Sequence, residues 1–400
     1  MQAYLIDGIR TPIGNFGGSL APVRTDDLAA HVIRELLARH PGLDPAAVAD
    51  VILGCANQAG EDNRNVARMA LLLAGMPWSV PGETVNRLCA SGMSAVIHAR
   101  RAIHSGDGDL CIAGGVEGMT RGPYVVSKTA KPFGTDARMY DSSFGWRFIN
   151  LHMQSLYGTD AMGMTAENLV EQYNISRDDQ DKFAVWSQIK ATAARDSGRL
   201  AAEITPVQAP KGKGELVPVE HDEFIKPGTT TEILGKLKPA FKKDGSVTAG
   251  NASGLNDGAA ALLIASENGM KNHNLRPIAR IVSSAVVGVE PRIMGIGPVG
   301  ASQQALATAG LTLNDMSVIE LNEAFAAQVL ACTRSLGIAD QDERLNPNGG
   351  AIALGHPLGM SGARIVLSAA RTLQKNGGQY ALCTMCIGVG QGYAVILERA

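Results

Sequence analysis

An internal repeat constrains the fold of this 400-residue chain more than any other feature of its sequence. The segment Asp50–Leu53 (DVIL) resembles Ser317–Glu320 (SVIE), and Gly92–Ser94 (GMS) recurs as Gly359–Ser361, both with an offset of 267 residues. Two chance likenesses have no reason to share one offset, so the matches favour a duplicated domain. We therefore expect two halves of similar architecture.

The repeat also relates chemically different residues. Under the 267-residue offset Cys89 corresponds to His356, and each lies in a loop directly before a stretch with helical spacing. If the halves pack about a pseudo-twofold axis, the two loops meet and a thiol faces an imidazole. A third likeness, Cys111-Ile112 with Cys386-Ile387, has an offset of 275, which we interpret as a difference in loop length between the halves.

Helical and extended segments alternate along the chain, which indicates an α/β fold of layered sheets and helices. We expect helices over residues 26–39, 94–103, 165–173, 303–308 and 363–373, and strands over 51–53, 110–113, 260–264 and 318–321. The amino-acid composition differs in residues 121–241, which contain four of the seven tyrosines. We expect an N-terminal half in residues 1–120, completed by about 242–274, an inserted loop domain in 121–241, and a C-terminal half in 275–400.

Composition excludes several classes of protein. The 36 Lys and Arg residues nearly balance the 38 Asp and Glu residues, so net charge gives no reason to expect a nucleic-acid or membrane partner. No apolar run approaches the ~18 residues of a membrane-spanning helix. Six irregularly spaced cysteines do not resemble a disulfide framework, which favours a reducing compartment and predicts a cytoplasmic protein.

Cys89 is the candidate nucleophile. A buried structural cysteine is the commoner role for a single thiol, but Ala90, Ser91 and Gly92 leave space around this sulfur. The helix expected directly after it predicts a lowered thiol pKa. His356, beside Pro357 in a loop of small residues, is the candidate base, with a pKa expected near the working pH.

The pair Cys383 and Cys386 also suggests a metal or redox site. Two sulfurs do not complete a tetrahedral zinc site, and no second pair of this spacing exists in the sequence. A redox pair of this kind opens a helix after a strand, whereas Gly388–Gly392 here leads into a second apolar run. We expect no metal, and we place Cys386 at the mouth of a glycine-rich turn.

Five long segments resemble the signature segments of the thiolases, and the likeness extends from Asp7–Pro12 to the last expected strand. The five are Arg87–Gly92 (RLCASG), Gly250–Gly258 (GNASGLNDG), Asn322–Ala326 (NEAFA), Gly349–Gly362 around His356, and Cys386–Gly390 (CIGVG). The resemblance implies duplicated, layered α-β-α-β-α domains with an inserted loop domain. It also implies an acyltransferase that uses coenzyme A as cosubstrate and holds no permanent cofactor.

The resemblance assigns roles to residues. Cys89 becomes acylated while His356 takes its proton, and Cys386 moves the α-proton of the acetyl group. His356 and a water held by Asn322 form one oxyanion site, and the backbone N–H groups of Cys89 and Gly388 form the other. Because the α-proton of a thioester is very weakly acidic, donors placed in advance are needed to stabilise the enolate.

The family pattern also suggests where coenzyme A lies, since the chain has no phosphate-binding glycine fingerprint of its own. By similarity, Ser253, Phe325 and Met162 lie beside the pantetheine, and Lys226 and Phe241 lie near the nucleotide. The family further implies a homo-oligomer, a dimer or a tetramer.

Other segments bear on the substrate. Val23–Leu28, Asn57–Arg68 and Phe144–Asn150 resemble those of thiolases that cleave 3-oxoadipyl-CoA to succinyl-CoA and acetyl-CoA in bacterial degradation of aromatic compounds. A substrate that ends in a carboxylate needs a cation at the far end of its pocket. The candidate cations are Arg147, which we expect between the aromatic flanks Trp146 and Phe148, and then Arg138 and Arg64.

Three alternatives stay open at this point. The enzyme could be an acetyl-CoA acetyltransferase that acts on acetoacetyl-CoA or another 3-ketoacyl-CoA. Two readings from other classes are a thiol-disulfide or metal protein built on Cys383 and Cys386, and a non-catalytic acyl-CoA carrier. Neither of these two accounts for His356 and Asn322 in loops that match the family signatures.

Overall fold

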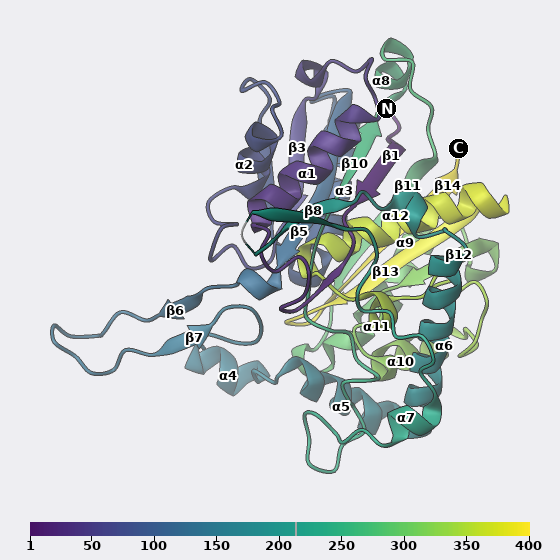
Figure 1. The fold of residues 1–400 in the computed structure, drawn as a ribbon. Helices are drawn as coiled ribbons and strands as arrows, with labels where there is room; N and C mark the ends of the chain where they lie inside the picture. Colours follow the sequence, from purple (N-terminus) through teal and green to yellow (C-terminus); the bar gives the residue numbers. More distant parts are fainter. Residues whose placement is uncertain (213) are drawn as a thin grey trace.

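One sheet runs through the molecule, and the four strands on each side of its centre follow one another in an equivalent order. In each half the first strand is central, the last strand is next to it, and β4 is an additional strand at the N-terminal edge. The computed structural model describes residues 1–212 and 214–400 (Figure 1). The order is β12-β13-β14-β11-β1-β10-β5-β3-β4, with β2 paired to β10. The strands are β1 (Tyr4–Arg10), β2 (Gly14–Asn15), β3 (Asp50–Gly54), β4 (Gly82–Val85), β5 (Leu110–Gly118), β10 (Asn256–Ala265), β11 (Ala279–Gly288), β12 (Met316–Leu321), β13 (Tyr380–Ile387) and β14 (Gln391–Arg399).

The central pair of strands defines a pseudo-twofold axis. β1 and β11 run antiparallel, with Tyr4 opposite Arg280 and Leu5 opposite Ala279. On the outer side of each strand the register shifts at an equivalent place, between Leu5 and Asp7 in β1 and between Ile281 and Ser283 in β11. The predicted duplication is therefore visible down to a repeated bulge.

Strand register corrects the third sequence likeness. Val51 pairs with Ile112 in the N-terminal half, and Val318 pairs with Ala381 in the C-terminal half. Since Val51 and Val318 are equivalent, Ile112 corresponds to Ala381, and the connection before β13 is two residues longer than its counterpart. Cys386 is therefore equivalent to Glu117, and its match with Cys111 was wrong, because a shared Cys-Ile dipeptide does not report strand register.

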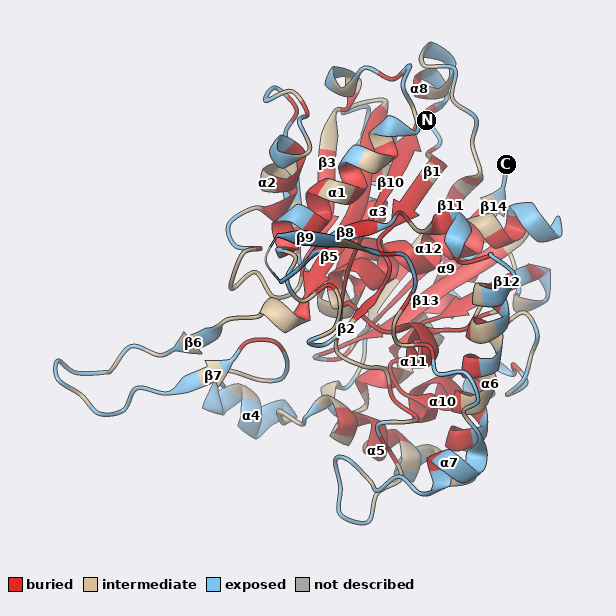
Figure 2. Ribbon diagram, viewed as in Figure 1, coloured by how far each residue is buried: buried red, intermediate tan, exposed pale blue. Residues whose placement is uncertain are grey.

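Five layers follow along the molecule, as the sequence predicts. α1 (Thr25–Ala38) and α2 (Val66–Leu73) cover the outer face of the N-terminal half. α9 (Gly297–Ala309) and α10 (Ala326–Leu336) cover the outer face of the C-terminal half. α3 (Ser91–Ser105) and α12 (Leu358–Asn376) lie between the two halves in the largest apolar cluster. The α-β-α-β-α architecture is confirmed, and the two central helices are buried along most of their length (Figure 2).

Glycines let the two central helices touch backbone to backbone. A Cβ atom on Gly92 would lie 2.5 Å from the carbonyl oxygen of Gly359, and one on Gly362 would lie 2.3 Å from the amide nitrogen of Met93. Side chains at these positions would push the helices apart. Because the contact involves the first turns of both helices, it also brings together the loops that precede them, which carry Cys89 and His356.

Residues 121–241 pack against both halves. β6 (Tyr124–Val126) and β7 (Met139–Asp141) form an exposed arm that extends from the body (Figures 1 and 2). Apolar residues of the two longest helices of this segment join the C-terminal cluster, and those of its second hairpin join the N-terminal cluster.

The remaining helices and strands of the molecule are α4 (Leu151–Tyr157), α5 (Met162–Tyr173), α6 (Arg177–Asp196), β8 (Val207–Lys211), β9 (Glu215–Val219), α7 (Thr231–Gly235), α8 (Glu267–Asn272) and α11 (Ala351–Leu354). Among the described residues, every helix is too short or too polar to cross a membrane.

Gly92→Ala tests the helix contact. The added methyl group meets backbone of the opposite helix, which cannot move aside as a side chain can, so we expect a loss of about 1–3 kcal/mol of stability. Gly42→Ala is the control, because a Cβ there meets nothing within 4 Å, and its effect should stay within about 0.5 kcal/mol. Thermal unfolding followed by circular dichroism measures both variants. Equal stability of the two would contradict the close approach.

Candidate active site

Cys89 is presented by a strained turn. It lies in a single 3-10 turn, Leu88–Ala90, directly before α3. Leu88 has a φ of 48°, a conformation that costs a leucine energy and is found where the surroundings impose it. The Leu88 N–H donates to Oδ1 of Asn86 at 2.9 Å, which holds the turn. The sequence prediction that Cys89 immediately precedes a helix is confirmed.

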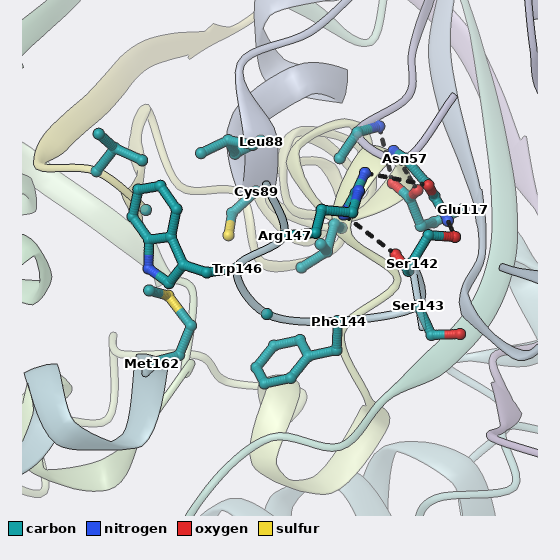
Figure 3. Close-up of a pocket in the computed structure, with 15 residues that line it drawn as sticks. Asn57, Leu88, Cys89, Glu117, Ser142, Ser143, Phe144, Trp146, Arg147 and Met162 are labelled. Atoms are coloured by element: carbon teal, nitrogen blue, oxygen red, sulfur yellow. Dashed lines mark hydrogen bonds between the residues drawn. The ribbon is translucent and has the colours of Figure 1, made fainter. Parts of the chain in front are cut away.

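The thiol opens into a cavity of about 220 Å³ (Figure 3). The walls come from the Cys89 loop, the loop after β3, the segment 142–147, the start of α5 and the turn after β13. In Figure 3 the sulfur lies between the indole of Trp146 and the guanidinium of Arg147. The lining residues are Ala56, Asn57, Leu88, Cys89, Glu117, Ser142, Ser143, Phe144, Gly145, Trp146, Arg147, Met162, Leu358, Gly388 and Val389.

Opposing influences act on the Cys89 thiol. Burial raises its pKa most strongly, and the Glu117 carboxylate raises it further. The backbone N–H groups of Gly388 and of Cys89 itself lower it, and the net result is a pKa of about 11. The expectation of a lowered pKa was therefore wrong, because loss of solvent outweighs the helix terminus. The two N–H groups assigned to an oxyanion site by resemblance do flank the sulfur.

His356 is held from several sides. It is 4% exposed, and its backbone N–H donates to Oδ1 of Asn256 at 2.9 Å. Its Nδ1 lies 2.7 Å from Oγ of Ser361, whose hydroxyl donates to the carbonyl of Pro357. Nδ1 is therefore the protonated nitrogen, and Nε2 presents its lone pair, 3.4 Å from Nδ2 of Asn322. Ser361 belongs to the repeated GMS segment, although its role was not predicted.

The charge state of His356 differs from the expectation. Burial lowers its pKa most, the Arg364 cation lowers it further, and the pKa is about 3 rather than near the working pH. The imidazole is accordingly neutral. It can accept a proton at Nε2, and the resulting cation is favoured only when an anion forms nearby.

Cys386 is the penultimate residue of β13 and is 1% exposed. Burial raises its pKa well above the usual range, and the neighbouring Cys89 raises it further, so it is a protonated thiol that can donate. Cys383 lies three residues earlier in the same strand and packs in a different apolar cluster. The two sulfurs therefore face opposite sides of β13, and this geometry does not support a shared metal or redox site.

The predicted catalytic residues lie on adjacent elements. Asn322 contacts His356, Gly388 contacts the Cys89 sulfur, and Cys89 lies close enough to Cys386 to raise the pKa of the Cys386 thiol. Among the described residues, no hydrogen bond joins Cys89 to His356. Their pairing during a reaction stays a prediction.

Of the residues expected at coenzyme A, Met162, Phe241, Phe325 and Ser253 lie near one another. Met162 lines the cavity wall, and the rings of Phe241 and Phe325 meet edge to face with centroids 6.2 Å apart. The Ser253 N–H donates to the carbonyl of the residue before Phe325 at 3.0 Å. Lys226 is exposed, with its ammonium group 5.0 Å from the centre of the Phe224 ring.

Of the three candidate arginines, one lines the cavity. Arg147 lies in its wall, whereas Arg138 is exposed in the arm and Arg64 is exposed before α2. Arg147 donates to Oδ1 of Asn57 and to the carbonyl of Ser142, each at 3.4 Å. No carboxylate among the described residues forms an ion pair with Arg147.

The expected aromatic flanks do not hold this guanidinium. Phe148 packs on Tyr140 with ring centroids 4.9 Å apart, and the Trp146 indole donates to the carbonyl of Asp160. Adjacent residues of an irregular segment point in different directions, so proximity in sequence was a poor guide. Asn57 and Ser142 were not predicted as its partners, although Asn57 lies in a loop equivalent to the one that carries Asn322.

A buried acidic group borders the cavity. The thiol of Cys55 and the carboxylates of Asp62 and Glu117 lie within 4.8 Å of one another, close enough to hold a metal ion. All four carboxylate oxygens already accept backbone N–H groups, and the Cys55 thiol donates to Asp62. Ligand atoms satisfied in this way do not fit a metal centre, so we assign none here.

Comparison with known proteins agrees with this geometry. The family model described as the thiolase N-terminal domain matches residues 3–268, and the one described as the thiolase C-terminal domain matches residues 275–399. A 3-oxoadipyl-CoA/3-oxo-5,6-dehydrosuberyl-CoA thiolase of Escherichia coli K12 is 59% identical over 398 residues, and a beta-ketoadipyl-CoA thiolase of Acinetobacter baylyi is 57% identical. Each alignment covers 100% of this chain and 99% of the relative.

Solved structures share the whole fold. The acetyl-CoA acetyltransferase of Bacillus anthracis matches with a TM-score of 0.92 at 40% identity, and human mitochondrial 3-ketoacyl-CoA thiolase matches with 0.92 at 41%. Each comparison covers 100% of this chain and 99% of the other. The resemblance drawn from the signature segments is thereby confirmed, and the chain belongs to the thiolase family of acyltransferases.

Proposed function

We propose that this thiolase cleaves 3-oxoadipyl-CoA with coenzyme A, giving succinyl-CoA and acetyl-CoA, in the degradation of aromatic compounds. The observation that carries the proposal is that Cys89 and Arg147 line one cavity, and that the described part of the chain gives this arginine no acidic partner. Relatives at 56–59% identity over their full length, named as beta-ketoadipyl-CoA or 3-oxoadipyl-CoA thiolases, support it.

In the first step Cys89 attacks the C3 ketone of the substrate, and its proton passes to Nε2 of His356. The C2–C3 bond breaks, and its electron pair stays on C2 as the enolate of acetyl-CoA. Cys386, a protonated thiol, donates to C2, and acetyl-CoA leaves. The succinyl group remains as a thioester on Cys89. The neutral imidazole and the high thiol pKa values suit this sequence, because charge forms only when substrate is present.

In the second step the thiol of coenzyme A passes its proton to the Cys386 thiolate and attacks the succinyl thioester. The Cys89–acyl bond breaks, succinyl-CoA leaves, and the Cys89 thiolate takes back the proton held by His356. The N–H groups of Cys89 and Gly388 stabilise the oxyanion on the acyl group, as their position beside the sulfur supports. Asn322 and His356 serve the enolate oxygen of the acetyl group, with the free Oδ1 of Asn322 available to hold a water.

Recognition of the terminal carboxylate falls to Arg147. Its two contacts to Asn57 and Ser142 are long, at 3.4 Å, and leave N–H donors of the guanidinium available. A carboxylate buried beside Cys89 without a partner costs several kcal/mol, and a bidentate pair with arginine offsets that cost. Arg138 and Arg64 lie outside the cavity, so we do not propose them as partners of the terminal carboxylate.

Coenzyme A reaches the thiol past Met162, between the Phe241–Phe325 pair and Ser253, with Lys226 free to meet a phosphate. It acts as cosubstrate, and the reaction written above needs no resident cofactor. We propose the same division of the chain as before, with halves formed by 1–120 plus about 242–274 and by 275–400, and an insertion at 121–241. Residence in the cytoplasm and assembly as a homodimer or homotetramer complete the proposal.

Acetoacetyl-CoA is the competing substrate. It has no terminal carboxylate and gives Arg147 nothing to bind. Thiolysis of the two substrates side by side separates the functions, and a kcat/KM that favours acetoacetyl-CoA would contradict the proposal.

Cys89→Ala should abolish acyl transfer and preserve the fold, because the sulfur is the only atom removed from a turn held by backbone contacts. Intact-protein mass spectrometry after mixing with acetyl-CoA should show an acetyl adduct on the wild type and none on the variant. A stable adduct on another cysteine would contradict the assignment.

Cys386→Ser should still permit acylation of Cys89 and lose C–C bond formation, because a hydroxyl transfers the α-proton far less readily than a thiol. The two half-reactions are assayed separately, by adduct formation and by exchange of the acetyl α-protons of acetyl-CoA with deuterium. Equal loss of both would make Cys386 a structural residue or a partner in activating Cys89.

Arg147→Ala should lower kcat/KM for 3-oxoadipyl-CoA by about ten- to a hundredfold and spare acetoacetyl-CoA, since the lost ion pair serves the carboxylate alone. Arg138→Ala, in the exposed arm, is the matched control and should change neither rate. Equal losses on both substrates from Arg147→Ala would assign that arginine a structural role.

A further inference from the structure

Glu117 is the buried group that the reaction leaves unexplained. It lies in β5, is 1% exposed and lines the Cys89 cavity. By strand register it occupies in the N-terminal half the place that Cys386 has in the C-terminal half. One copy of the duplicated position carries the proposed acid, and the other carries a carboxylate.

The carboxylate accepts three hydrogen bonds, all from backbone. Oε2 accepts from the N–H of Ala56 at 3.0 Å and from that of Gly359 at 2.7 Å, and Oε1 accepts from the N–H of Asn57 at 3.0 Å. No cation among the described residues forms an ion pair with it. Hydrogen bonds to a charged acceptor are each roughly twice as strong as neutral ones, so the group fixes these three N–H positions firmly.

The donors belong to two separate parts of the site. Asn57 directs its side chain to Arg147, so the loop that Glu117 holds also positions the proposed carboxylate reader. Gly359 lies in the first turn of α12, three residues after His356, and comes from the other half of the molecule. One carboxylate therefore joins the substrate side of the cavity, where Figure 3 shows it beside Asn57, to the helix that follows the base.

Keeping an anion here has a cost. Burial raises the pKa of Glu117 to about 7, and its charge raises the pKa of Cys89, which opposes formation of the thiolate. The three-way hydrogen bonding explains why a carboxylate is retained. A glutamine offers one acceptor oxygen and would turn an NH₂ group toward a backbone N–H.

We propose that Glu117 is a positioning residue for the thiolase reaction, which fixes the Asn57 loop and the first turn of α12 relative to Cys89. The inference rests on the proposed roles of Cys89, His356 and Arg147. Glu117 itself transfers no proton in the reaction, and it acts through the residues whose backbone it holds.

The test compares Glu117→Gln with Asp62→Asn. Asp62 is 4% exposed and accepts backbone N–H groups of residues 58 and 60, so its variant removes a buried charge from the same loop without touching α12. Four quantities are measured at pH 8: kcat and KM for both acyl-CoA substrates, the thermal midpoint, and the rate at which iodoacetamide alkylates Cys89.

Glu117→Gln should lower kcat on both substrates by about ten- to a hundredfold, the usual effect of a displacement near 1 Å. The ratio of kcat/KM for 3-oxoadipyl-CoA over acetoacetyl-CoA should also fall, because Arg147 loses its support. Alkylation of Cys89 should become faster, by up to about tenfold for one unit of thiol pKa, because the nearby anion is gone. Asp62→Asn should keep kcat within about twofold.

A structural role alone predicts another pattern, in which turnover falls in proportion to the folded fraction, the turnover of the folded protein is unchanged, and alkylation of Cys89 becomes faster only as far as the protein unfolds. That pattern overturns the proposal. So does wild-type turnover in Glu117→Gln. Should this variant fail to fold, Glu117→Asp keeps the charge and shortens the reach, and it should lower kcat while leaving alkylation unchanged. Acetylation of wild-type Cys89 is checked first, since its absence refutes the proposed function rather than the role of Glu117.

Discussion

The backbone contact between α3 and α12 is the constraint on which the site depends. Gly92, Gly359 and Gly362 allow the first turns of these helices to approach without side chains between them. Cys89 lies in the loop before α3, and His356 lies in the loop before α12. The contact that joins the two halves therefore also brings these two loops together. The association of the two halves and the assembly of the site therefore depend on the same contact between α3 and α12.

Duplication supplied equivalent positions, and divergence gave them different chemistry. Cys89 corresponds to His356, Cys386 to Glu117, and Asn322 to Cys55 under the strand register. Burial then sets the resting charge states, raising the pKa of both thiols and lowering that of the imidazole. The two thiols and the imidazole therefore stay neutral until an acyl-CoA binds. The Glu117 carboxylate, in contrast, accepts hydrogen bonds from backbone N–H groups and fixes their positions.

Local periodicity and a repeat that keeps its register predict an α/β fold with two similar halves. The resemblance to the thiolases implies the five layers and the roles of the loops that carry the candidate catalytic residues. The sequence does not predict the pKa values of Cys89 and His356, since desolvation depends on what packs around a group in three dimensions. Arg147 could be proposed from its segment, but its partner Asn57 lies 90 residues away in the chain, and the irregular segment that carries Ser142 has no periodicity from which their contact could be predicted. The equivalence of Glu117 and Cys386 was not predicted, because the Cys-Ile likeness matched Cys386 with Cys111, six residues away from the position that strand pairing gives.

The most direct measurement is the identity of the acyl group on the enzyme when 3-oxoadipyl-CoA reacts without free coenzyme A. Rapid quenching followed by peptide mass spectrometry should find a succinyl group on Cys89 and one equivalent of released acetyl-CoA. A succinyl group on a different residue, or release of acetyl-CoA with no acyl-enzyme, would contradict the account.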